Sequence, residues 1–401
     1  MLRSGSRIGA ACVIATILFW LAMASLAVWA GLLAFRGGFW RADQRLAAAS
    51  DLPAWPGVVA IIPARDEAET IERAVASLLA QDYPGECRVI VVDDGSSDGT
   101  AEAARGVAGA GRLTIIDGAP LEPGWTGKLW ALSQGLRRID DVLPETEFVL
   151  LTDADITHPT DGLRRLVHAA QTGRRNLVSV MVKLHCASFC ERLLVPAFVF
   201  FFQKLYPFPW INDPRNRTAG AAGGCMLVRR EALAQAGGIE AIRDRVIDDC
   251  ALAALLKPFG PIWLGLAEGF HSLRRYDTLD NFWRMVARTA FVQLNYSIAA
   301  AFGTVIAMAV IYLMPPIGLI AGLAIGDATL ASAAGGAWIL MSVAYLPTLR
   351  YYGLGPVSAL TLPAAAMLYT AMTVDSAAQY KFGRGAPWKG RRYDRATGER
   401  G

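Results

Sequence analysis

The sequence predicts an α/β domain built around a mostly parallel sheet, with membrane-spanning helices at both ends of the chain. Three observations support this fold class. In the middle of the chain, short apolar runs that end in acidic turns alternate with segments whose apolar residues recur at helical spacing. Such alternation of strand and helix builds a mostly parallel sheet. The two ends of the chain contain charge-free apolar stretches, each long enough to cross a bilayer of about 30 Å.

The N-terminal apolar stretch, residues 8–35, predicts an uncleaved transmembrane anchor. Arg3 and Arg7 precede it, so a secretory signal peptide is the alternative. The stretch is longer than the apolar core of a signal peptide, and no convincing small-residue cleavage site closes it. We therefore expect a helix that stays in the membrane.

The C-terminal third predicts a transmembrane region at residues 291–374. Three successive charge-free gaps follow Arg288, Asp327 and Arg350, and each has the length of one spanning helix. Pro315-Pro316 interrupts the first span, so its end is not fixed by the sequence. The expected spans cover about residues 296–320, 328–349 and 352–374.

The C-terminal tail, residues 375–401, is basic. It either lies on anionic lipid or is a solvated, disordered end, and the sequence favours neither. Its basic residues include Lys381, Arg384, Lys389, Arg391, Arg392 and Arg395.

The central segment, residues 50–290, has the size of one soluble domain. Unbroken apolar runs within it indicate strands that are buried on both faces, as in a parallel sheet. A helix is expected over residues 68–80, directly after the first strand. The four expected strands cover residues 58–63, 88–92, 113–116 and 148–152.

Adjacent acids follow the second expected strand. Asp93 and Asp94 cannot both be core residues, because a buried charge without a partner is costly, so at least one must face a ligand or solvent. The alternative is an Asx-type turn that caps the next helix, which Ser97 or Asp98 could provide alone. We expect both acids to contact a ligand.

A second acidic pair, Asp153 and Asp155, follows the fourth expected strand. The carboxyl ends of parallel strands are where open α/β sheets bind ligands. With one residue between them, one acid can reach a metal ion while the other reaches a ribose. Mg²⁺ or Mn²⁺ needs only one or two protein carboxylates when substrate phosphates complete its ligands. Helix capping before Pro159 is the alternative.

Four motifs in this order carry a resemblance to a known family. PARDE at residues 63–67, DDGSSDGT at 93–100, GKLWAL at 127–132 and TDAD at 152–155 resemble the family 2 glycosyltransferases, which have the GT-A fold, a Rossmann-like nucleotide-binding domain. The apolar ends, together with GGCMLVRREAL, VIDDCALA and WRMVARTAF, look more narrowly like the hopanoid-associated glycosyltransferases, relatives of ceramide glucosyltransferase. The likeness covers about residues 8–390.

The resemblance implies a role for each matching residue on the donor side. Asp94 matches the acid that contacts the uracil or ribose, and Lys128 matches the lysine that approaches the diphosphate. Asp155 matches the metal-binding acid, with Asp153 next to the ribose. The remaining residues implied to bind the nucleotide sugar are Pro63, Ala64, Asp66, Glu67 and Asp93.

On the acceptor side, the resemblance implies a loop at Gly223, Gly224 and Cys225 and a catalytic pair at Asp248 and Asp249. The second acid of that pair serves as base. Elementary chemistry agrees, because an inverting transfer needs a carboxylate that takes a proton from the acceptor hydroxyl, and a neighbouring carboxylate raises proton affinity. The alternative is that both acids only stabilise a helix N-terminus.

One departure from the family pattern concerns Arg288. Processive relatives carry a QxxRW signature that clamps the acceptor chain, whereas residues 285–289 here are MVART, without the glutamine and tryptophan. This difference argues against a polymerase. It leaves Arg288 either an acceptor-side residue or a surface arginine near the membrane.

These observations predict a membrane-bound inverting glycosyltransferase that moves a sugar from a nucleotide diphosphate sugar, with UDP expected, to the hydroxyl of a lipid. The resemblance makes a hopanoid the leading acceptor, although that step rests on analogy. The alternatives are a polyprenyl-phosphate glycosyltransferase, whose phosphate nucleophile needs no base, and a non-catalytic nucleotide-binding membrane scaffold. A short aromatic stretch, Leu193–Phe202, is either interfacial, where it could admit the lipid, or a buried core helix.

Cytosolic nucleotide sugars would place the catalytic domain on the cytoplasmic side of the inner membrane, in a multi-pass protein. With three C-terminal spans, the basic tail would then lie outside, against the positive-inside rule, so the topology is left open. A net charge of +4 without interleaved aromatic and basic residues argues against a nucleic acid partner. Protein partners are not indicated.

Overall fold

The computed structural model describes residues 2–109, 111–382, 386–388 and 391–393, and these form two compact units. The sheet unit contains residues 43–185 and 208–275 together with a short C-terminal hairpin. The helical unit contains residues 2–42, 186–207 and 276–382. The expected soluble domain, residues 50–290, therefore includes two segments, 186–207 and 276–290, that the structure groups with the helices.

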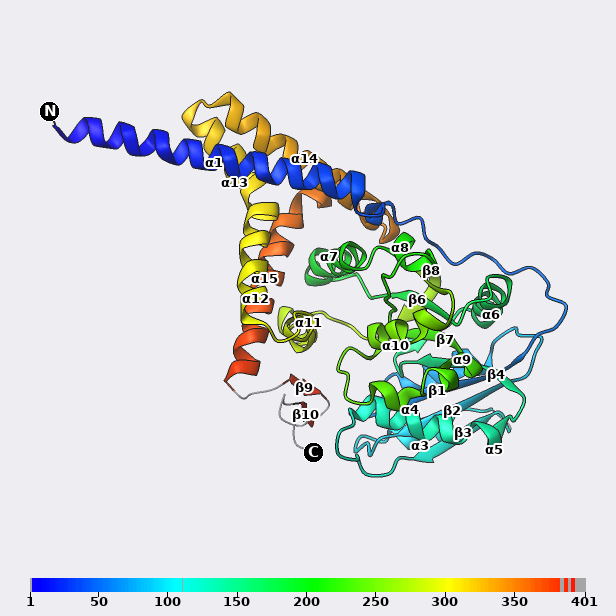
Figure 1. Ribbon diagram of the computed structural model, residues 1–401. Coiled ribbons are helices and arrows are strands. Elements are labelled where there is room, and N and C mark those ends of the chain that lie inside the picture. Colours follow the sequence, from blue (N-terminus) through cyan, green and yellow to red (C-terminus); the bar gives the residue numbers. More distant parts are fainter. Residues whose placement is uncertain (1, 110, 383–385, 389–390, 394–401) are drawn as a thin grey trace. The chain divides into compact units, whose positions relative to one another are not determined.

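The sheet unit confirms the predicted α/β fold class. Among the described residues, its main sheet has eight strands in the order β3-β2-β1-β4-β7-β6-β8-β5 (Figure 1). Strands β3, β2, β1 and β4 are mutually parallel, whereas β7 runs antiparallel to both of its neighbours and makes the sheet mixed. The strands are β1 (Gly57–Ala64), β2 (Cys87–Asp93), β3 (Leu113–Asp117), β4 (Thr146–Thr152), β5 (Ile156–Thr157), β6 (Leu177–Lys183), β7 (Cys225–Arg229) and β8 (Ile262–Ser272), with β9 (Ala386–Trp388) and β10 (Arg391–Tyr393) in the hairpin.

Helices cover both faces of the parallel half of this sheet. In β1, Val58, Ala60 and Ile62 belong to one buried apolar cluster with α2 and α6. The alternate residue Ile61 faces α4, where a Cβ on Gly135 would lie only 2.5 Å from its side chain. Glycine therefore sets how closely α4 approaches the sheet. The helices are α2 (Ile71–Leu79), α3 (Thr100–Arg105), α4 (Gly127–Arg137), α5 (Ile139–Val142), α6 (Gly162–Thr172), α8 (Phe208–Asn212), α9 (Arg230–Gln235) and α10 (Asp248–Leu256), with 3₁₀ turns η2 (Ile239–Ile242) and η3 (Lys257–Phe259).

The first helix of the sheet unit, α2, starts later than its apolar spacing predicts. Residues 68–80 were the expected range, but α2 begins at Ile71. The backbone N–H of Glu67 donates to Thr100, and that of Ala68 donates to Asp98. The residues before α2 are therefore held by the loop after β2 and do not continue the helix.

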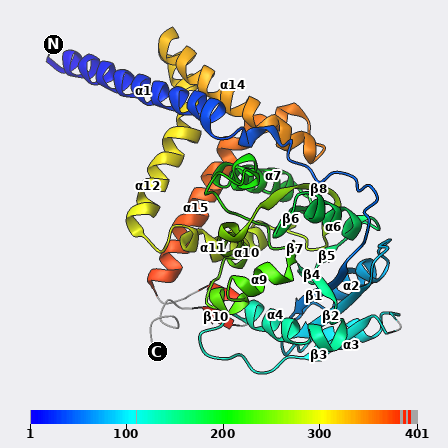
Figure 2. The ribbon, with the colours of Figure 1, turned by 45° about the vertical axis from the view of Figure 1, so that its right-hand side comes forward.

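The helical unit contains four helices that are long and apolar enough to cross a membrane, among the residues that the structure describes. These candidate spans agree with the number expected from the charge-free stretches, and they are Val13–Phe35, Ile298–Ile325, Ala328–Tyr351 and Pro356–Lys381. The elements of the unit, visible in Figures 1 and 2, are α1 (Leu2–Phe35), the 3₁₀ turns η1 (Phe39–Arg41) and η5 (Pro356–Thr361), α7 (Phe189–Leu205), α11 (Leu279–Gln293), α12 (Ile298–Met308), the π-turn η4 (Ala309–Leu313), α13 (Met314–Ile325), α14 (Ala328–Tyr351) and α15 (Leu362–Lys381).

The double proline does not end its span. Pro315 has no N–H to give to the carbonyl of Ile311, which lies four residues earlier. That carbonyl instead accepts hydrogen bonds from Ser25 Oγ at 3.2 Å and Trp29 Nε1 at 2.9 Å, both on α1. The π-turn η4 absorbs the local change, so α12 and α13 form one interrupted span.

Helix α13 approaches α14 closely through two glycines spaced four residues apart. A Cβ on Gly322 would lie 2.6 Å from the backbone nitrogen of Ala331, and one on Gly318 would lie 2.9 Å from Ala334 Cβ. Small residues at such spacing let helix backbones pack in an apolar environment.

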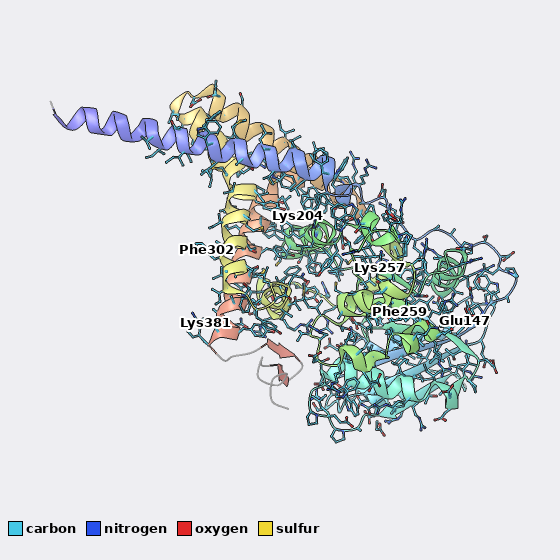
Figure 3. The ribbon with its side chains drawn as sticks, viewed as in Figure 1. Glu147, Lys204, Lys257, Phe259, Phe302 and Lys381 are labelled. Carbon is cyan, nitrogen blue, oxygen red and sulfur yellow. The ribbon has the colours of Figure 1, made fainter. Side chains whose placement is uncertain are left out.

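The aromatic stretch Leu193–Phe202 lies within α7. Of the two alternatives, a buried core helix agrees with its packing. Phe200 is fully buried, and its ring packs against Trp29 of α1 and Tyr345 of α14. Near the end of α7, Lys204, which is labelled in Figure 3, donates from Nζ to the Tyr312 hydroxyl at 2.7 Å. Helix α7 is therefore part of the core of the helical unit.

The structure describes part of the basic tail. Lys381 is the last residue of α15, and Arg391 and Arg392 lie in β10. Arg384, Lys389 and Arg395 lie outside the described residues.

We predict that Gly322→Ala lowers the free energy of unfolding by about 1–3 kcal/mol, because its methyl group would press on the α14 backbone. Thermal unfolding of the purified protein in detergent measures the change. Gly303→Ala on α12 is the matched control, because a Cβ there meets no atom within 4 Å. Since alanine favours helix, the control should be neutral or slightly stabilised. Equal melting temperatures for the two variants would contradict the packing described.

Candidate active site

Several of the predicted donor-side residues lie at one edge of the sheet. Strands β2, β1 and β4 are adjacent and parallel, so the turns that carry Asp94, Asp66 and Asp153 emerge on the same side. Pro63 and Ala64 are the last two residues of β1. The carbonyl of Ala64 accepts a hydrogen bond from the Asp94 backbone at 2.8 Å, which joins the first two turns.

These two turns are locked to each other by reciprocal hydrogen bonds. The backbone N–H of Asp66 donates to Ser96 Oγ at 3.0 Å, and Asp66 Oδ1 accepts from the Ser97 backbone at 2.9 Å. The backbone N–H of Glu67 donates to Thr100 Oγ1 at 2.8 Å. Asp66 has a φ of 50°, a left-handed conformation that the surrounding bonds hold in place. The result is a preformed polar rim at the carboxyl ends of β1 and β2.

The acids of the second turn have different local environments. Both carboxylate oxygens of Asp93 accept from Ser96, one from its hydroxyl and one from its backbone N–H. Asp98 accepts from the backbone and the hydroxyl of Thr100, so it provides the cap that the sequence suggested. Asp93 is thus held by its own turn, and Asp94 is almost fully buried beside it. Contact of either residue with a nucleotide stays a prediction.

Lys128 is the centre of the acidic cluster. It lies in the first turn of α4, and its Nζ is 2.8 Å from Asp153 Oδ1 and 3.0 Å from Asp248 Oδ2. Asp153 follows β4, whereas Asp248 begins α10, so one cation joins three distant segments of the chain. The buried Asp248 Oδ2 makes this ion-pair contact without the geometry of a hydrogen bond, and among the described residues it has no hydrogen-bond partner.

The charge state of Lys128 follows from this surrounding. Burial by itself lowers the pKa of an ammonium group, but attraction to Asp153 and Asp248 outweighs it and raises the pKa of Lys128. The lysine therefore stays charged at neutral pH. Burial raises the pKa of Asp153, Lys128 opposes that rise, and the nearby Asp155 adds to it.

Asp249 lies next to this cluster as the second residue of α10. Its Oδ2 accepts from the Gly223 backbone at 2.9 Å, and its Oδ1 accepts from the Cys250 backbone at 2.7 Å. Burial, followed by repulsion from Asp248, raises the pKa of Asp249 to about 6, while Lys128 and the two backbone bonds act against the shift. A carboxylate with this pKa is ionised at neutral pH and can still take up a proton, as a general base must.

The glycine pair before β7 brings the backbone close to the cluster. A Cβ on Gly223 would lie 3.3 Å from both Asp249 Oδ2 and Lys128 Nζ. The carbonyl of Gly224 accepts from Thr152 Oγ1 at 2.8 Å, which ties this loop to the end of β4. Cys225 is fully buried, and burial raises the pKa of its thiol, so it is a packing residue and not a nucleophile.

A second group of side chains surrounds Asp155, and the sequence interpretation missed two of its members. Asp155 Oδ2 accepts from Ser272 Oγ at 2.9 Å and from Arg274 Nε at 3.3 Å. Arg274 Nη2 also donates to Glu67 Oε1 at 2.5 Å. Ser272 ends β8, so the rule that polar residues after a buried strand mark the ligand edge could have found this segment.

Arg288 belongs to the other compact unit of the chain. It lies on α11 in the helical unit, where its carbonyl accepts from the Tyr380 hydroxyl at 3.3 Å. Its proposed place on the acceptor side stays a prediction. In the sheet unit, Arg229 pairs with Glu147, a residue labelled in Figure 3, and thereby ties β7 to β4.

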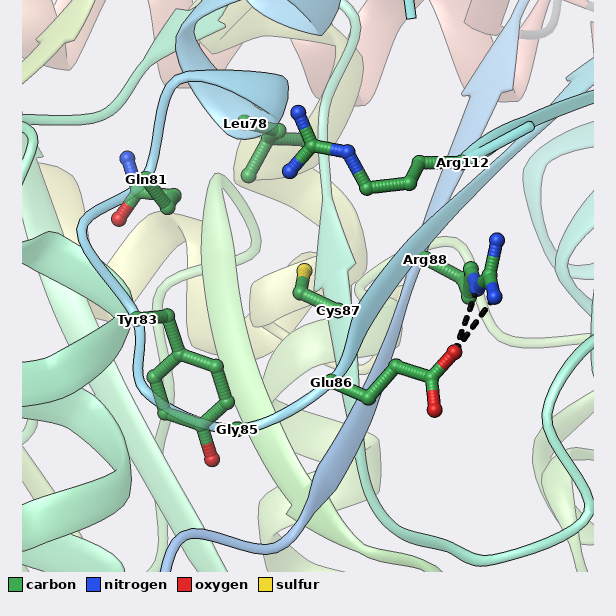
Figure 4. Close-up of a pocket in the computed structure, with 8 residues that line it drawn as sticks. All are labelled: Leu78, Gln81, Tyr83, Gly85, Glu86, Cys87, Arg88 and Arg112. Carbon is green, nitrogen blue, oxygen red and sulfur yellow. Dashed lines mark hydrogen bonds and ion pairs between the residues drawn. The ribbon is translucent and has the colours of Figure 1, made fainter. Parts of the chain in front are cut away.

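A cavity of about 230 Å³ lies elsewhere in the sheet unit, where β2 begins. Figure 4 shows its lining, including the ion pair between Arg88 and Glu86. Because Cys87 and Arg88 start β2, this cavity is at the opposite edge from the acidic cluster. None of the predicted site residues lines it.

Known proteins resemble the part of the chain that carries these acids. Residues 59–237 match the family model described as Glycosyl transferase family 2. This segment is a family 2 glycosyltransferase domain. It includes every predicted donor-side residue as well as Gly223–Cys225, whereas Asp248 and Asp249 lie beyond its end.

Two relatives that share one name match about half of the chain at the same identity. The 4,4'-diaponeurosporenoate glycosyltransferases of Staphylococcus aureus strains bovine RF122 / ET3-1 and USA300 are each 29% identical over 196 residues. The match covers 48% of this chain and 49% of each relative. The chain thus spans about half the length of these relatives.

A solved structure shows the fold over a longer stretch. The mannosyltransferase from Pyrobaculum calidifontis, in complex with GDP-Man and Mn²⁺, superposes with a TM-score of 0.52 at 20% identity. The superposition covers 89% of this chain and 99% of that protein. The family 2 domain therefore has the GT-A fold, as predicted. The narrower relation to hopanoid-associated glycosyltransferases stays a prediction.

We predict that Lys128→Met lowers the free energy of unfolding by about 1–3 kcal/mol, because its partly buried carboxylate partners lose their cation. The loss should be smaller at pH 5 than at pH 8. The pKa values of Asp153 and Asp249 are raised, so these acids take up protons in the acidic range and no longer need the cation. Thermal unfolding at the two pH values measures the difference.

Lys257→Met is the matched control for this experiment. Lys257 Nζ donates to the backbone carbonyls of Ile211 and Asp213, which do not titrate. The nearby Asp213 carboxylate has a lowered pKa, held down first by hydrogen bonds from Arg215, so it stays ionised at both pH values. Its effect should therefore differ little between the two pH values. A Lys128→Met effect that is equally independent of pH would contradict the electrostatic account.

Proposed function

We propose that the protein is a membrane-bound glycosyltransferase that transfers a sugar from a nucleoside diphosphate sugar to a lipid hydroxyl with inversion. The observation that carries this proposal is the convergence of Asp153, Asp248 and Asp249 around Lys128 at the ligand edge of a family 2 domain. A purely structural ion pair would need one acid for one lysine. The excess of carboxylates instead suits a site that receives further positive charge.

A divalent cation fits this donor set. The acids are hard oxygen ligands, which Mg²⁺ and Mn²⁺ prefer. In the described part of the chain, Asp155 belongs to no group of three convergent protein ligands, which suits an ion whose remaining ligands are phosphate oxygens and water. Asp155 would hold the ion, and the bound ion would supply charge stabilisation for the leaving diphosphate. The Mn²⁺ in the Pyrobaculum mannosyltransferase supports this assignment at the level of the fold.

The transfer itself needs a base and a cationic environment from the chain. Asp249 removes the proton from the acceptor hydroxyl as its oxygen forms a bond to the anomeric carbon. The bond between that carbon and the diphosphate oxygen breaks, and the nucleoside diphosphate leaves with the electron pair. Lys128 lies in the same cluster and offers positive charge to the leaving group. Attack opposite the leaving group gives inversion, so an α-linked donor yields a β-linked product.

The helical unit and the relatives support a hydrophobic acceptor. In the described part of the chain, four helices are suited to span a membrane, so the enzyme is expected to meet its acceptor in the bilayer. The Staphylococcus aureus relatives are named for the acceptor 4,4'-diaponeurosporenoate. A hopanoid hydroxyl stays the acceptor that we propose, and UDP the carrier. We place the enzyme in the inner membrane, with the family 2 domain facing the cytoplasm where nucleotide sugars are made.

The proposal is tested by supplying the purified protein in lipid vesicles with radiolabelled UDP and GDP sugars and a hopanoid acceptor, with and without Mn²⁺. We expect a labelled lipid with a β-glycosidic bond, identified by mass spectrometry and NMR, and its loss when EDTA removes the ion. Asp249→Asn should reduce its formation by 10²-fold or more, on the order expected for loss of a general base.

Asp141→Asn is the matched control, because Asp141 is an exposed acid of α5 that pairs with Arg138. It should retain wild-type activity. Transfer to polyprenyl phosphate that survives Asp249→Asn would instead identify the phosphate-acceptor reaction. Nucleotide binding without transfer to any lipid would identify a non-catalytic scaffold.

We predict that kcat/KM rises with pH through a midpoint near 6 and then levels off. The pKa of Asp249 is raised to about 6, so below this pH the base is protonated and cannot accept the hydroxyl proton. Initial rates at low acceptor concentration between pH 4.5 and 8.5 measure the profile. A kcat/KM that stays flat down to pH 4.5 would refute this role for Asp249.

A further inference from the structure

Arg274 connects two acids that arise from different strands. Its Nη2 donates to Glu67 Oε1 at 2.5 Å, and its Nε donates to Asp155 Oδ2 at 3.3 Å. Glu67 belongs to the turn after β1, whereas Asp155 follows β4. One guanidinium therefore lies between the polar rim of the nucleotide turns and the acid that we assign to the divalent ion.

The position of Arg274 is set by the backbone before it. The N–H of Leu273 donates to the Asp155 carbonyl at 2.7 Å, and Ser272 pairs with Ile156 in the contact between β8 and β5. Ser272 Oγ donates to the same carboxylate oxygen as Arg274 does. The segment after β8 is thus registered against Asp155 by both main-chain and side-chain bonds.

The charges at this place require a counter-ion. The side chains of Glu67 and Asp155 are only 13% and 12% exposed, while that of Arg274 is 37% exposed. Buried carboxylates that lose their cation are strongly destabilised. A divalent ion at Asp155 would lie close to the guanidinium, and the two cations would repel each other.

We propose that Arg274 is an internal counter-ion that competes with the divalent ion for the Asp155 carboxylate. This inference rests on the metal assignment made under the proposed function. Binding of the ion releases Arg274 from Asp155, and the freed N–H groups then bind the diphosphate of the donor. Arg274 therefore weakens binding of the ion alone and strengthens binding of the diphosphate once the ion is present. Guanidinium groups suit this second role because their planar fork matches phosphate oxygens.

The first test measures Mn²⁺ binding to the full-length protein in detergent, with electron paramagnetic resonance reporting free Mn²⁺. We expect Arg274→Gln to bind Mn²⁺ about tenfold more tightly than the wild type. Arg274→Lys keeps a charge but cannot bridge both acids, so its affinity for Mn²⁺ should lie between those of the wild type and Arg274→Gln. Asp155→Asn should bind Mn²⁺ more weakly than the wild type. Arg138→Gln is the matched control, because it removes an exposed guanidinium of the same unit, and it should not change the affinity.

A thermal measurement checks that the variants are folded and reports the same competition. Without Mn²⁺, Arg274→Gln should melt at a lower temperature than the wild type, because Glu67 and Asp155 lose their counter-ion. Added Mn²⁺ should raise its melting temperature more than that of the wild type, since the ion restores the missing charge.

The second test measures binding of UDP and GDP at saturating Mn²⁺ by calorimetry. Arg274→Gln should bind its preferred nucleotide several-fold more weakly than the wild type. A higher affinity for Mn²⁺ together with a lower affinity for the nucleotide separates the proposed role from simple structural damage, which would lower both affinities.

The outcomes separate this inference from the metal assignment. If Asp155→Asn weakens Mn²⁺ binding but Arg274→Gln does not strengthen it, the competition is refuted and the metal site stands. If Asp155→Asn binds Mn²⁺ as the wild type does, the metal assignment is refuted, and the role of Arg274 with it. Unchanged nucleotide affinity in Arg274→Gln would overturn the coupling to the diphosphate.

Discussion

The contact of Lys128 with several carboxylates is the constraint on which the candidate site depends. The lysine is carried by the first turn of α4, and its acidic neighbours come from the end of β4 and the start of α10. Removing charges even partly from water is costly unless they are paired, so this half-buried arrangement requires all three segments to be in place. The packing of the sheet unit thereby places these charges at fixed positions next to one another. Its excess of negative charge is what makes a cation-bound diphosphate a suitable ligand.

The rest of the edge is organised around the same need for partners. The turns after β1 and β2 are tied together by hydrogen bonds of Asp66 with Ser96 and Ser97 and of Glu67 with Thr100. Arg274 performs a similar task for Glu67 and Asp155. The site is therefore largely preformed, and binding exchanges one set of charge partners for another.

The helical unit follows the corresponding rule for an apolar environment. There, a backbone carbonyl without a donor is expensive, and the carbonyl of Ile311, released by Pro315, is satisfied by Ser25 and Trp29 of α1. Buried Phe200 of α7 also contacts both the first and the third candidate spans, through Trp29 and Tyr345. A family 2 domain attached to such a unit has the parts expected of an enzyme that joins a water-soluble donor to a lipid acceptor.

The sequence by itself determined the elements that depend on local pattern. Apolar runs indicated the four strands β1 to β4 but not the other strands of the main sheet. Charge-free stretches indicated the candidate spans, and the order of acidic motifs indicated the family. Tertiary structure alone decided which side chains meet. Three contacts do not follow from residue spacing in the sequence. They are the pairing of Lys128 with Asp248, the restraint of Asp93 by Ser96 and the bridge formed by Arg274. Each joins atoms whose positions depend on the turns and the strand register around them. The raised pKa of Asp249 is likewise a property of burial and neighbours, which only the folded chain provides.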